Sequence, residues 1–153
     1  MERRYADQTS STAEELAHAF LRAIQAKDKG AILSLLADGF ALEVPFNVSG
    51  TNDLSDSWYG LEAAAANFEE TWKTIEVVKY AEVEVTAGRD SNVAFAETLG
   101  DMKMANGRPY RNRYVFRFDT EGGKIKRIRE YANPVTSMVA YGIPLAQSHL
   151  ISN

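Results

Sequence analysis

Apolar side chains in the first part of the chain recur at the spacing of α-helices. Over residues 13–27 they return every three or four positions, which places them on one buried stripe. Thr12 and Glu15 form a capping-box pattern at the start of this helix. Asp28 is a typical cap for a second, shorter helix, which we predict to end at the turn formed by residues 38–39.

The pattern changes to strict alternation at Phe40. Apolar and polar residues alternate from there to Phe46, which predicts a half-buried strand, and Pro45 marks its edge or its exit. Residues 47–59 have the polar composition of a loop. Helical spacing returns at 61–72 and predicts a third helix.

The second half of the chain has the pattern of strands joined by short turns. Strands are predicted at residues 75–86, 93–104, 109–119 and 124–131. A short helix follows, with Pro134 at its first position. Runs of helices followed by runs of strands are typical of α+β proteins with an antiparallel sheet. A long twisted sheet around a few helices leaves a concavity in which a ligand pocket can form.

Length and composition fit a globular protein. The 153 residues are 45% hydrophobic and 25% charged, and we expect one domain over 11–145 with a flexible tail at 1–10 and another at 146–153. The net charge of −4 gives no electrostatic footprint for nucleic acid or an anionic membrane. The apolar runs are far shorter than a membrane span needs. The absence of cysteine fits a cytoplasmic location and excludes thiolate chemistry.

Glu130 is the first candidate for chemistry. It shares a strand face with Ile128, so both side chains point into the concavity if one of them does. A carboxyl group in such a place is partly desolvated, which raises its pKa and suits it to proton transfer near neutral pH. The alternative is a structural ion pair with Arg113 or Arg129.

Glu97 is the candidate for a second acid or base. It lies on the same strand face as Phe95 and Leu99, and two carboxyl groups in one apolar cavity shift each other's pKa in opposite directions. The alternative is that a bulge reverses the strand and turns Glu97 to solvent.

Polar and aromatic residues supply the predicted contacts to a ligand. Asn112 and Tyr114 would orient a ligand oxygen, and Trp58 with Tyr59 would cover a flat ring or else anchor the third helix. The full set of predicted ligand contacts is Phe46, Trp58, Tyr59, Phe95, Asn112 and Tyr114. His18 and His149 are isolated, and no glycine-rich phosphate loop is present, so we expect neither a metal nor a cofactor.

Three stretches of the chain resemble a known superfamily. AIQAKDKGAILSLLADGFALEVP and WYGLEAAAANFEETW resemble the opening of nuclear-transport-factor-2-like and ketosteroid-isomerase-like proteins. GRPYRNRYVFRFDTEGGKIKRIREYANPVTSMVAYGIPL resembles the SnoaL-like polyketide cyclase branch, and within it the phenazine-biosynthesis A/B proteins. The resemblance covers about residues 12–145. It implies a cone, in which a curved, mixed and mostly antiparallel sheet wraps around three helices, and a homodimer formed through the sheet.

The resemblance also implies an active-site carboxylate at the position of Glu130. We therefore expect a cofactor-independent isomerase or cyclase of secondary metabolism, acting by acid–base catalysis on a hydrophobic cyclic carbonyl or enol compound. Two departures weigh against closer assignments. The histidine of phenazine A/B proteins has no counterpart at 70–75, and the arginine of epoxide hydrolases has none on the inward face of 93–99. A non-catalytic small-molecule binding protein and an epoxide hydrolase remain the alternatives.

Overall fold

The structure is a computed structural model that describes residues 11–144 of the chain, so both predicted tails and His149 lie outside the described residues. It contains four helices in this range: α1 (Ala13–Gln25), α2 (Lys29–Leu35), α3 (Leu61–Thr74) and α4 (Pro134–Tyr141). The predicted caps are confirmed. Thr12 Oγ1 accepts from the backbone N–H of Glu15 at 3.2 Å, and Asp28 Oδ1 accepts from that of Ala31 at 2.9 Å.

Seven strands form one mixed sheet. They are β1 (Leu36–Val44), β2 (Asp56–Tyr59), β3 (Ile75–Val77), β4 (Tyr80–Ala87), β5 (Val93–Met104), β6 (Pro109–Glu121) and β7 (Lys124–Ala132). Their order is β2-β1-β7-β6-β5-β3, with β4 also paired to β5. Only the β1–β7 pair is parallel among the described strands, so the sheet is mixed and mostly antiparallel.

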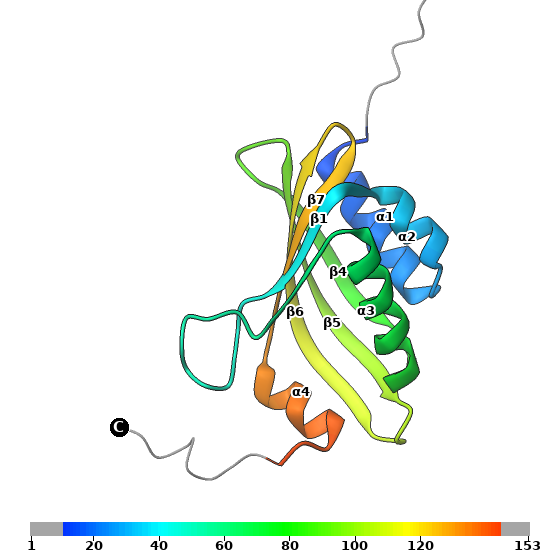
Figure 1. Cartoon of the computed structure of the whole chain (residues 1–153), viewed down its shortest axis with the longest axis vertical. Coiled ribbons are helices and arrows are strands. Elements are labelled where there is room, and N and C mark those ends of the chain that lie inside the picture. Colours follow the sequence, from blue (N-terminus) through cyan, green and yellow to red (C-terminus); the bar gives the residue numbers. More distant parts are fainter. Residues whose placement is uncertain (1–10, 145–153) are drawn as a thin grey trace, which may run out of the picture.

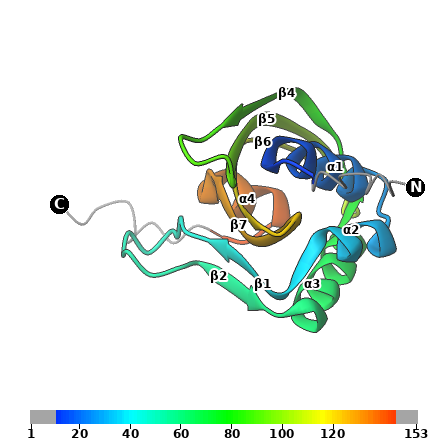
Figure 2. The same ribbon diagram turned by 90° about the horizontal axis from the view of Figure 1, so that it is seen from above.

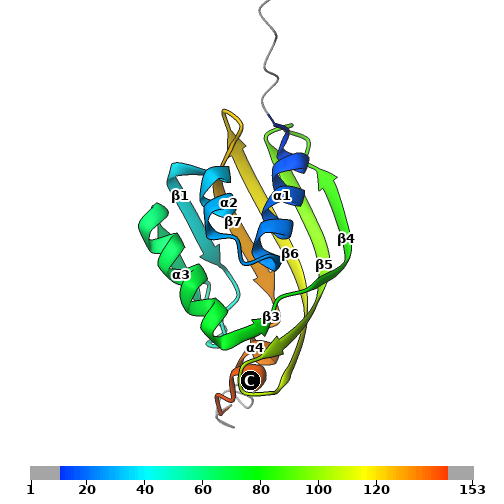
Figure 3. The ribbon, with the colours of Figure 1, turned by 90° about the vertical axis from the view of Figure 1, so that its right-hand side faces the viewer.

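The sheet curls, and the helices occupy its concave side. Figure 1 shows the long strands β5 and β6 bending past α1 and α3, with α4 at the opposite end from α1 and α2. The curl around α1 is visible from above in Figure 2, and Figure 3 shows α1, α2 and α3 lying in front of the sheet. This is the α+β cone that the sequence predicted, with α4 closing one end.

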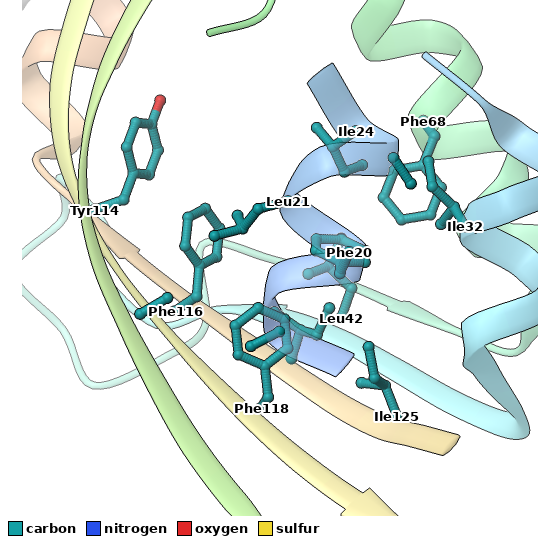
Figure 4. Close-up of a cluster of buried hydrophobic side chains, with 14 of the residues drawn as sticks. Phe20, Leu21, Ile24, Ile32, Leu42, Phe68, Tyr114, Phe116, Phe118 and Ile125 are labelled. Carbon is teal, nitrogen blue, oxygen red and sulfur yellow. The ribbon is translucent and has the colours of Figure 1, made fainter. Parts of the chain in front are cut away.

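Alternating side chains of β6 build the core against α1. Phe116 and Phe118 point inward and are almost fully buried, and the Phe118 ring meets Phe20 edge to face with 5.7 Å between centroids (Figure 4). Each such ring contributes about 2 to 3 kcal/mol by leaving water. Tyr114 continues the same row and is also buried in this cluster (Figure 4). The aromatic row therefore runs from a filled end of the cone toward α4.

Three element boundaries differ from the prediction. Residues 38–39 lie inside β1 instead of forming a turn, because the parallel pairing of β1 with β7 already begins at Leu36. The predicted strand 75–86 is divided into β3 and β4, and the register of β4 against β5 shifts near Glu82, whose φ of 52° is left-handed. The predicted loop 47–59 ends in a short strand, β2, which pairs with β1.

Candidate active site

A cavity of about 490 Å³ lies between the concave face of the sheet, α3 and α4. A volume of this size is typical of small-molecule sites. Its wall is mostly apolar and aromatic: Trp58 of β2 and Trp72 of α3 contribute indole rings, and Met138 comes from α4. The cavity can therefore hold a hydrophobic ring compound, shielded on several sides from water.

The carboxyl group of Glu130 lies in this cavity. Glu130 pairs with Phe116 on β6 and follows Ile128 on the inward face of β7, as the alternation predicted. Glu130 is half-buried, and among residues 11–144 no hydrogen bond or ion pair engages its carboxyl group. Burial alone raises the pKa of Glu130 to about 7.

The alternative ion pairs of Glu130 are not formed. Arg129 lies on the outer face of the sheet, where its Nε donates to Oε2 of Glu43 at 2.9 Å. Arg113 is also on the outer face and is exposed. Glu130 thus faces a cavity without a neutralising cation, which is an arrangement that functional sites use to tune a carboxyl group.

Four phenol side chains share the cavity with Glu130: Tyr80, Tyr110, Tyr114 and Tyr141. Burial raises the pKa of Tyr80 and of Tyr114, and the charge of Glu130 adds to both shifts. These two hydroxyl groups therefore stay protonated at neutral pH and can donate hydrogen bonds to a ligand oxygen. The two rings meet edge to face with centroids 5.9 Å apart, so each limits the movement of the other.

Asn112 is buried, at 4% exposed, and is not among the residues that line the cavity. Its side chain instead makes hydrogen bonds to the start of α4. Its Nδ2 donates to the backbone oxygen of Asn133 at 3.0 Å and to the hydroxyl oxygens of Tyr110 and Ser137, both at 3.3 Å. Its Oδ1 accepts from the backbone N–H of Asn133 at 3.1 Å. The predicted contact between Asn112 and the ligand is therefore wrong, and Asn112 instead joins β6 to the start of α4.

Among the other predicted contacts, Phe46, Trp58 and Tyr114 line the cavity together with Glu130. Tyr59 does not, because it follows Trp58 on β2 and so points to the outer face, where it is 62% exposed. The idea that both aromatic residues cover the cavity therefore holds for Trp58 and is wrong for Tyr59.

Glu97 and Phe95 lie on the outer face of β5, so their predicted places in the cavity are wrong. Glu97 is exposed, and the ring of Phe95 lies 5.8 Å from the guanidinium carbon of Arg117. The inward positions of this strand are mainly small: Ala94, Ala96, Thr98, Gly100, Met102 and Met104. Both faces of β5 thus contain apolar residues, and the small ones turn inward because the large rings of β6 fill the space beside them. No bulge within β5 is involved in turning Glu97 to solvent.

The sequence analysis missed several wall residues. Tyr110 stands two positions before Asn112 in the same alternation, which was a usable signal. Ser137 and Tyr141 are four positions apart on α4 and so share a helix face. The inward direction of Tyr80 could not be predicted from the alternation of residues 75–86, because the chain breaks between β3 and β4 just before Tyr80.

A family model matches most of the chain but ends before Glu130 and α4. The model of the SnoaL-like domain matches residues 17–128. The chain belongs to the SnoaL-like family. A comparison with curated protein sequences gives no significant match.

Solved structures show what this SnoaL-like chain is similar to. A proposed isomerase from Bacillus subtilis is 26% identical with a TM-score of 0.75, and the match covers 87% of this chain and 94% of that one. A proposed polyketide cyclase from Pseudomonas putida is also 26% identical, with a TM-score of 0.67 and coverage of 85% and 98%. A Mycobacterium tuberculosis protein solved with estradiol-17β-hemisuccinate shares the fold at 20% identity and a TM-score of 0.67, with coverage of 82% and 98%.

The residues of the cavity wall in this SnoaL-like domain can be compared with those that an epoxide hydrolase or a metal site would need. Among the residues that the structure describes, no arginine lines the cavity, so the arrangement expected of an epoxide hydrolase is not found there. In the same range no group of three histidine, aspartate or glutamate side chains is placed to hold a metal ion.

No helix in the described range is both long and apolar enough to span a membrane.

Proposed function

We propose that this SnoaL-like protein is an isomerase or cyclase in which Glu130 transfers a proton to and from a hydrophobic cyclic carbonyl compound. The observation that carries the proposal is the carboxyl group of Glu130, which faces the cavity without a partner and has its pKa raised by burial to about 7. A general base is most effective when its pKa lies near the working pH.

The reaction begins with the carboxylate of Glu130 taking a proton from the carbon next to the ligand carbonyl. The electron pair of the broken C–H bond moves to the carbonyl oxygen and forms an enolate. The hydroxyl groups of Tyr80 and Tyr114 donate hydrogen bonds to this oxygen, which lowers the barrier because the charge develops there. In an isomerisation, a ligand with a β,γ double bond gives a conjugated dienolate, and Glu130 returns the proton to its γ carbon. In a cyclisation, the α carbon of the enolate attacks a second carbonyl of the same molecule, the first carbonyl re-forms, and the new alkoxide takes the proton back from Glu130.

The remaining wall residues hold the ligand in one orientation. The indole of Trp58 and the ring of Phe46 contact the flat face of the ligand, and Asn112 acts as a positioning residue through α4. Fixing one reactive conformation lowers the barrier by several kcal/mol in favourable cases. The proposal needs no cofactor, and it includes a role in secondary metabolism, a cytoplasmic location and a homodimer formed through the sheet.

The test compares Glu130→Gln with Glu97→Gln, which removes a carboxyl group from the outer face of the same sheet. Deuterium incorporation from D₂O into 1-tetralone and larger polycyclic ketones is followed by NMR. We expect exchange by the wild type, a loss of about 10²-fold to 10⁴-fold in Glu130→Gln, and wild-type exchange in Glu97→Gln. Because the base must be ionised, kcat/KM should rise with pH and level off above a pKa of about 7.

Two results would contradict the proposal. Equal exchange by the wild type and Glu130→Gln would remove Glu130 from the mechanism. Ligand binding by a wild type that exchanges no deuterium with any ketone of the panel would favour a non-catalytic binding protein on the same fold.

A further inference from the structure

The strand pairing is interrupted between β3 and β4, just before Tyr80 enters the cavity wall. Val78 and Lys79 belong to neither strand. The carbonyl oxygen of Lys79 accepts from the backbone N–H of Asp101 on β5 at 2.9 Å. Because neighbouring residues of a strand direct their backbone groups to opposite sides, the N–H of Tyr80 points away from β5. It needs a partner outside the sheet, because β4 pairs with β5 alone among the described strands.

Gln25, the last residue of α1, supplies this partner. Its Oε1 accepts from the backbone N–H of Tyr80 at 2.9 Å. Its Nε2 donates to the carbonyl oxygen of Leu21, one turn earlier in α1, at 3.3 Å, and this second bond fixes the orientation of the amide. The side chain of Gln25 thus takes the place that a neighbouring strand would occupy at this edge of the sheet.

Lys27 holds the chain on the other side of the interruption. It follows the C-cap of α1 and has a φ of 54°, a left-handed conformation for which helix ends usually use glycine. Its Nζ donates to the carbonyl oxygens of Trp72, Ile75 and Glu76 at 3.4, 2.8 and 2.9 Å, where α3 passes into β3. The strain of a lysine at this position is offset by three hydrogen bonds that a glycine could not make.

The end of α1 therefore holds the chain both before and after the interruption. The ring of Tyr80 packs against those of Tyr114 and Phe116, with centroids 5.9 and 5.7 Å away. The place of its Cα atom, from which the phenol extends, is held by the backbone hydrogen bond to Gln25. Neither Gln25 nor Lys27 lines the cavity, so both can act on a ligand only through the wall residues that they hold.

We infer that Gln25 and Lys27 are positioning residues that set where the hydroxyl group of Tyr80 lies in the cavity. The inference rests on the proposed function for the role of Tyr80, which is to donate a hydrogen bond to the enolate oxygen. Such a bond lowers the barrier only when the donor lies at hydrogen-bond distance from the oxygen that becomes charged. A small displacement of Tyr80 should therefore lower kcat and leave KM nearly unchanged.

A matched pair of variants at residue 25 tests this role. Gln25→Leu removes the acceptor, whereas the carboxylate of Gln25→Glu can still accept from the N–H of Tyr80. In the deuterium exchange of 1-tetralone we expect kcat to fall about threefold to tenfold in Gln25→Leu, with KM within about twofold, and to recover in Gln25→Glu. Gln25→Leu should add no further loss to Tyr80→Phe, because the two changes act through the same hydroxyl group.

Lys27→Gly tests the same attachment from a second position. Glycine adopts the positive φ of this turn freely, so the turn is kept while the amine is lost. We expect kcat to fall about twofold to fivefold, again with no further loss when Tyr80→Phe is already present. Lys29→Met is the control, because Lys29 joins α2 to Glu69 of α3 on the surface and should leave kcat unchanged.

NMR of tyrosine labelled with ¹³C at Cζ follows the phenol without turnover, and Tyr80→Phe assigns its resonance. We expect the Tyr80 resonance to shift in Gln25→Leu and in Lys27→Gly, and to keep its place in Lys29→Met. An unmoved Tyr80 resonance in both variants would overturn the inference, as would a loss of kcat that simply adds to that of Tyr80→Phe.

These outcomes are separable from the test of the proposed function. A shifted Tyr80 resonance in a protein that exchanges no deuterium would support the positioning by α1 and remove the proposed catalysis. Deuterium exchange that depends on Glu130, together with a Tyr80 resonance that neither variant moves, would do the reverse.

Discussion

The ring of Tyr114 fits over Gly100 on the neighbouring strand. A Cβ atom at residue 100 would lie 2.6 Å from Cε2 of Tyr114, closer than two carbon atoms can approach. The ring cannot easily retreat, because Phe116 stacks on it with centroids 5.4 Å apart and Tyr80 meets it edge to face. The absence of a side chain at Gly100 therefore sets where the hydroxyl group of Tyr114 lies in the cavity.

Gly100→Ala should displace this ring. We expect a loss of about 1 to 3 kcal/mol in the free energy of unfolding, as for other overpacked cores, and slower deuterium exchange with 1-tetralone. Urea unfolding and the exchange assay measure the two effects. Gly39→Ala is the matched control, since a Cβ there meets nothing within 4 Å. If Gly100→Ala were as stable and as active as Gly39→Ala, the glycine would have no such role.

The direction of Glu130 could be predicted because Ile128 is apolar and lies between the polar Arg127 and Arg129. Near the end of that strand, alternation then places Glu130 on the same face as Ile128. It does not hold over the whole strand, because Ile125 is buried as well and a register shift separates it from Arg127. The direction of Glu97 could not be predicted in the same way, because apolar side chains occupy both faces of β5. On β5 the packing against β6 decides which face turns inward, and the face with the smaller side chains is the one that does.

Helix α4 closes the cavity through a buried amide on β6. Asn112 makes hydrogen bonds to both backbone groups of Asn133, the residue that caps α4, and to Ser137 one turn later. Ser137 also meets the hydroxyl group of Tyr110 at 2.8 Å. The first turn of α4 is thus attached to β6 through a side chain that itself stays outside the cavity.

Asn112→Asp should loosen this attachment. The change removes the donating amide group and leaves a buried carboxyl group facing the carbonyl oxygen of Asn133, so we expect a loss of about 2 to 4 kcal/mol in stability. Hydrogen exchange should show lower protection of the α4 amides. Asn106→Asp is the comparison, because Asn106 bonds to Ala140 of α4 at 3.1 Å but is exposed. Equal protection of α4 in the two variants would contradict this role of Asn112.

The elements could be predicted where one signal dominates. Helical spacing, the caps at Thr12 and Asp28, Pro134 at the start of the last helix, and the turn-linked strands gave nearly the observed order. The break between β3 and β4 could not be predicted, because the residues on both sides suit a continuous strand. It arises where the sheet bends around α1, which is a property of the assembled fold.

The outer face of the sheet carries apolar side chains between charged ones. Val115 on β6 is 39% exposed, and its neighbours on β5, Phe95 and Leu99, are partly exposed on the same face. Several charges around them are already paired, such as Asp119 with Arg117 and Arg127. Apolar residues on a broad sheet face suit contact with a second copy of the chain.

Val115→Arg should weaken the proposed homodimer. The new guanidinium would lie directly across from Glu97, so the sheet of each monomer keeps a favourable cross-strand pair. Light scattering at increasing concentration should give about twice the chain mass of 17.0 kDa for the wild type and the monomer mass for the variant. A wild type that stays monomeric at all concentrations would contradict the dimer.

The catalytic proposal depends on one carboxyl group that exchanges its proton near neutral pH. The most direct measurement is an NMR titration of ¹³C-labelled glutamate carboxyl groups, with Glu130→Gln used to assign the resonance. We predict that the Glu130 resonance titrates with an apparent pKa of about 7. A value at or below the ordinary glutamate pKa of 4.5 would show that the group is solvated or paired, and would contradict its role as the base.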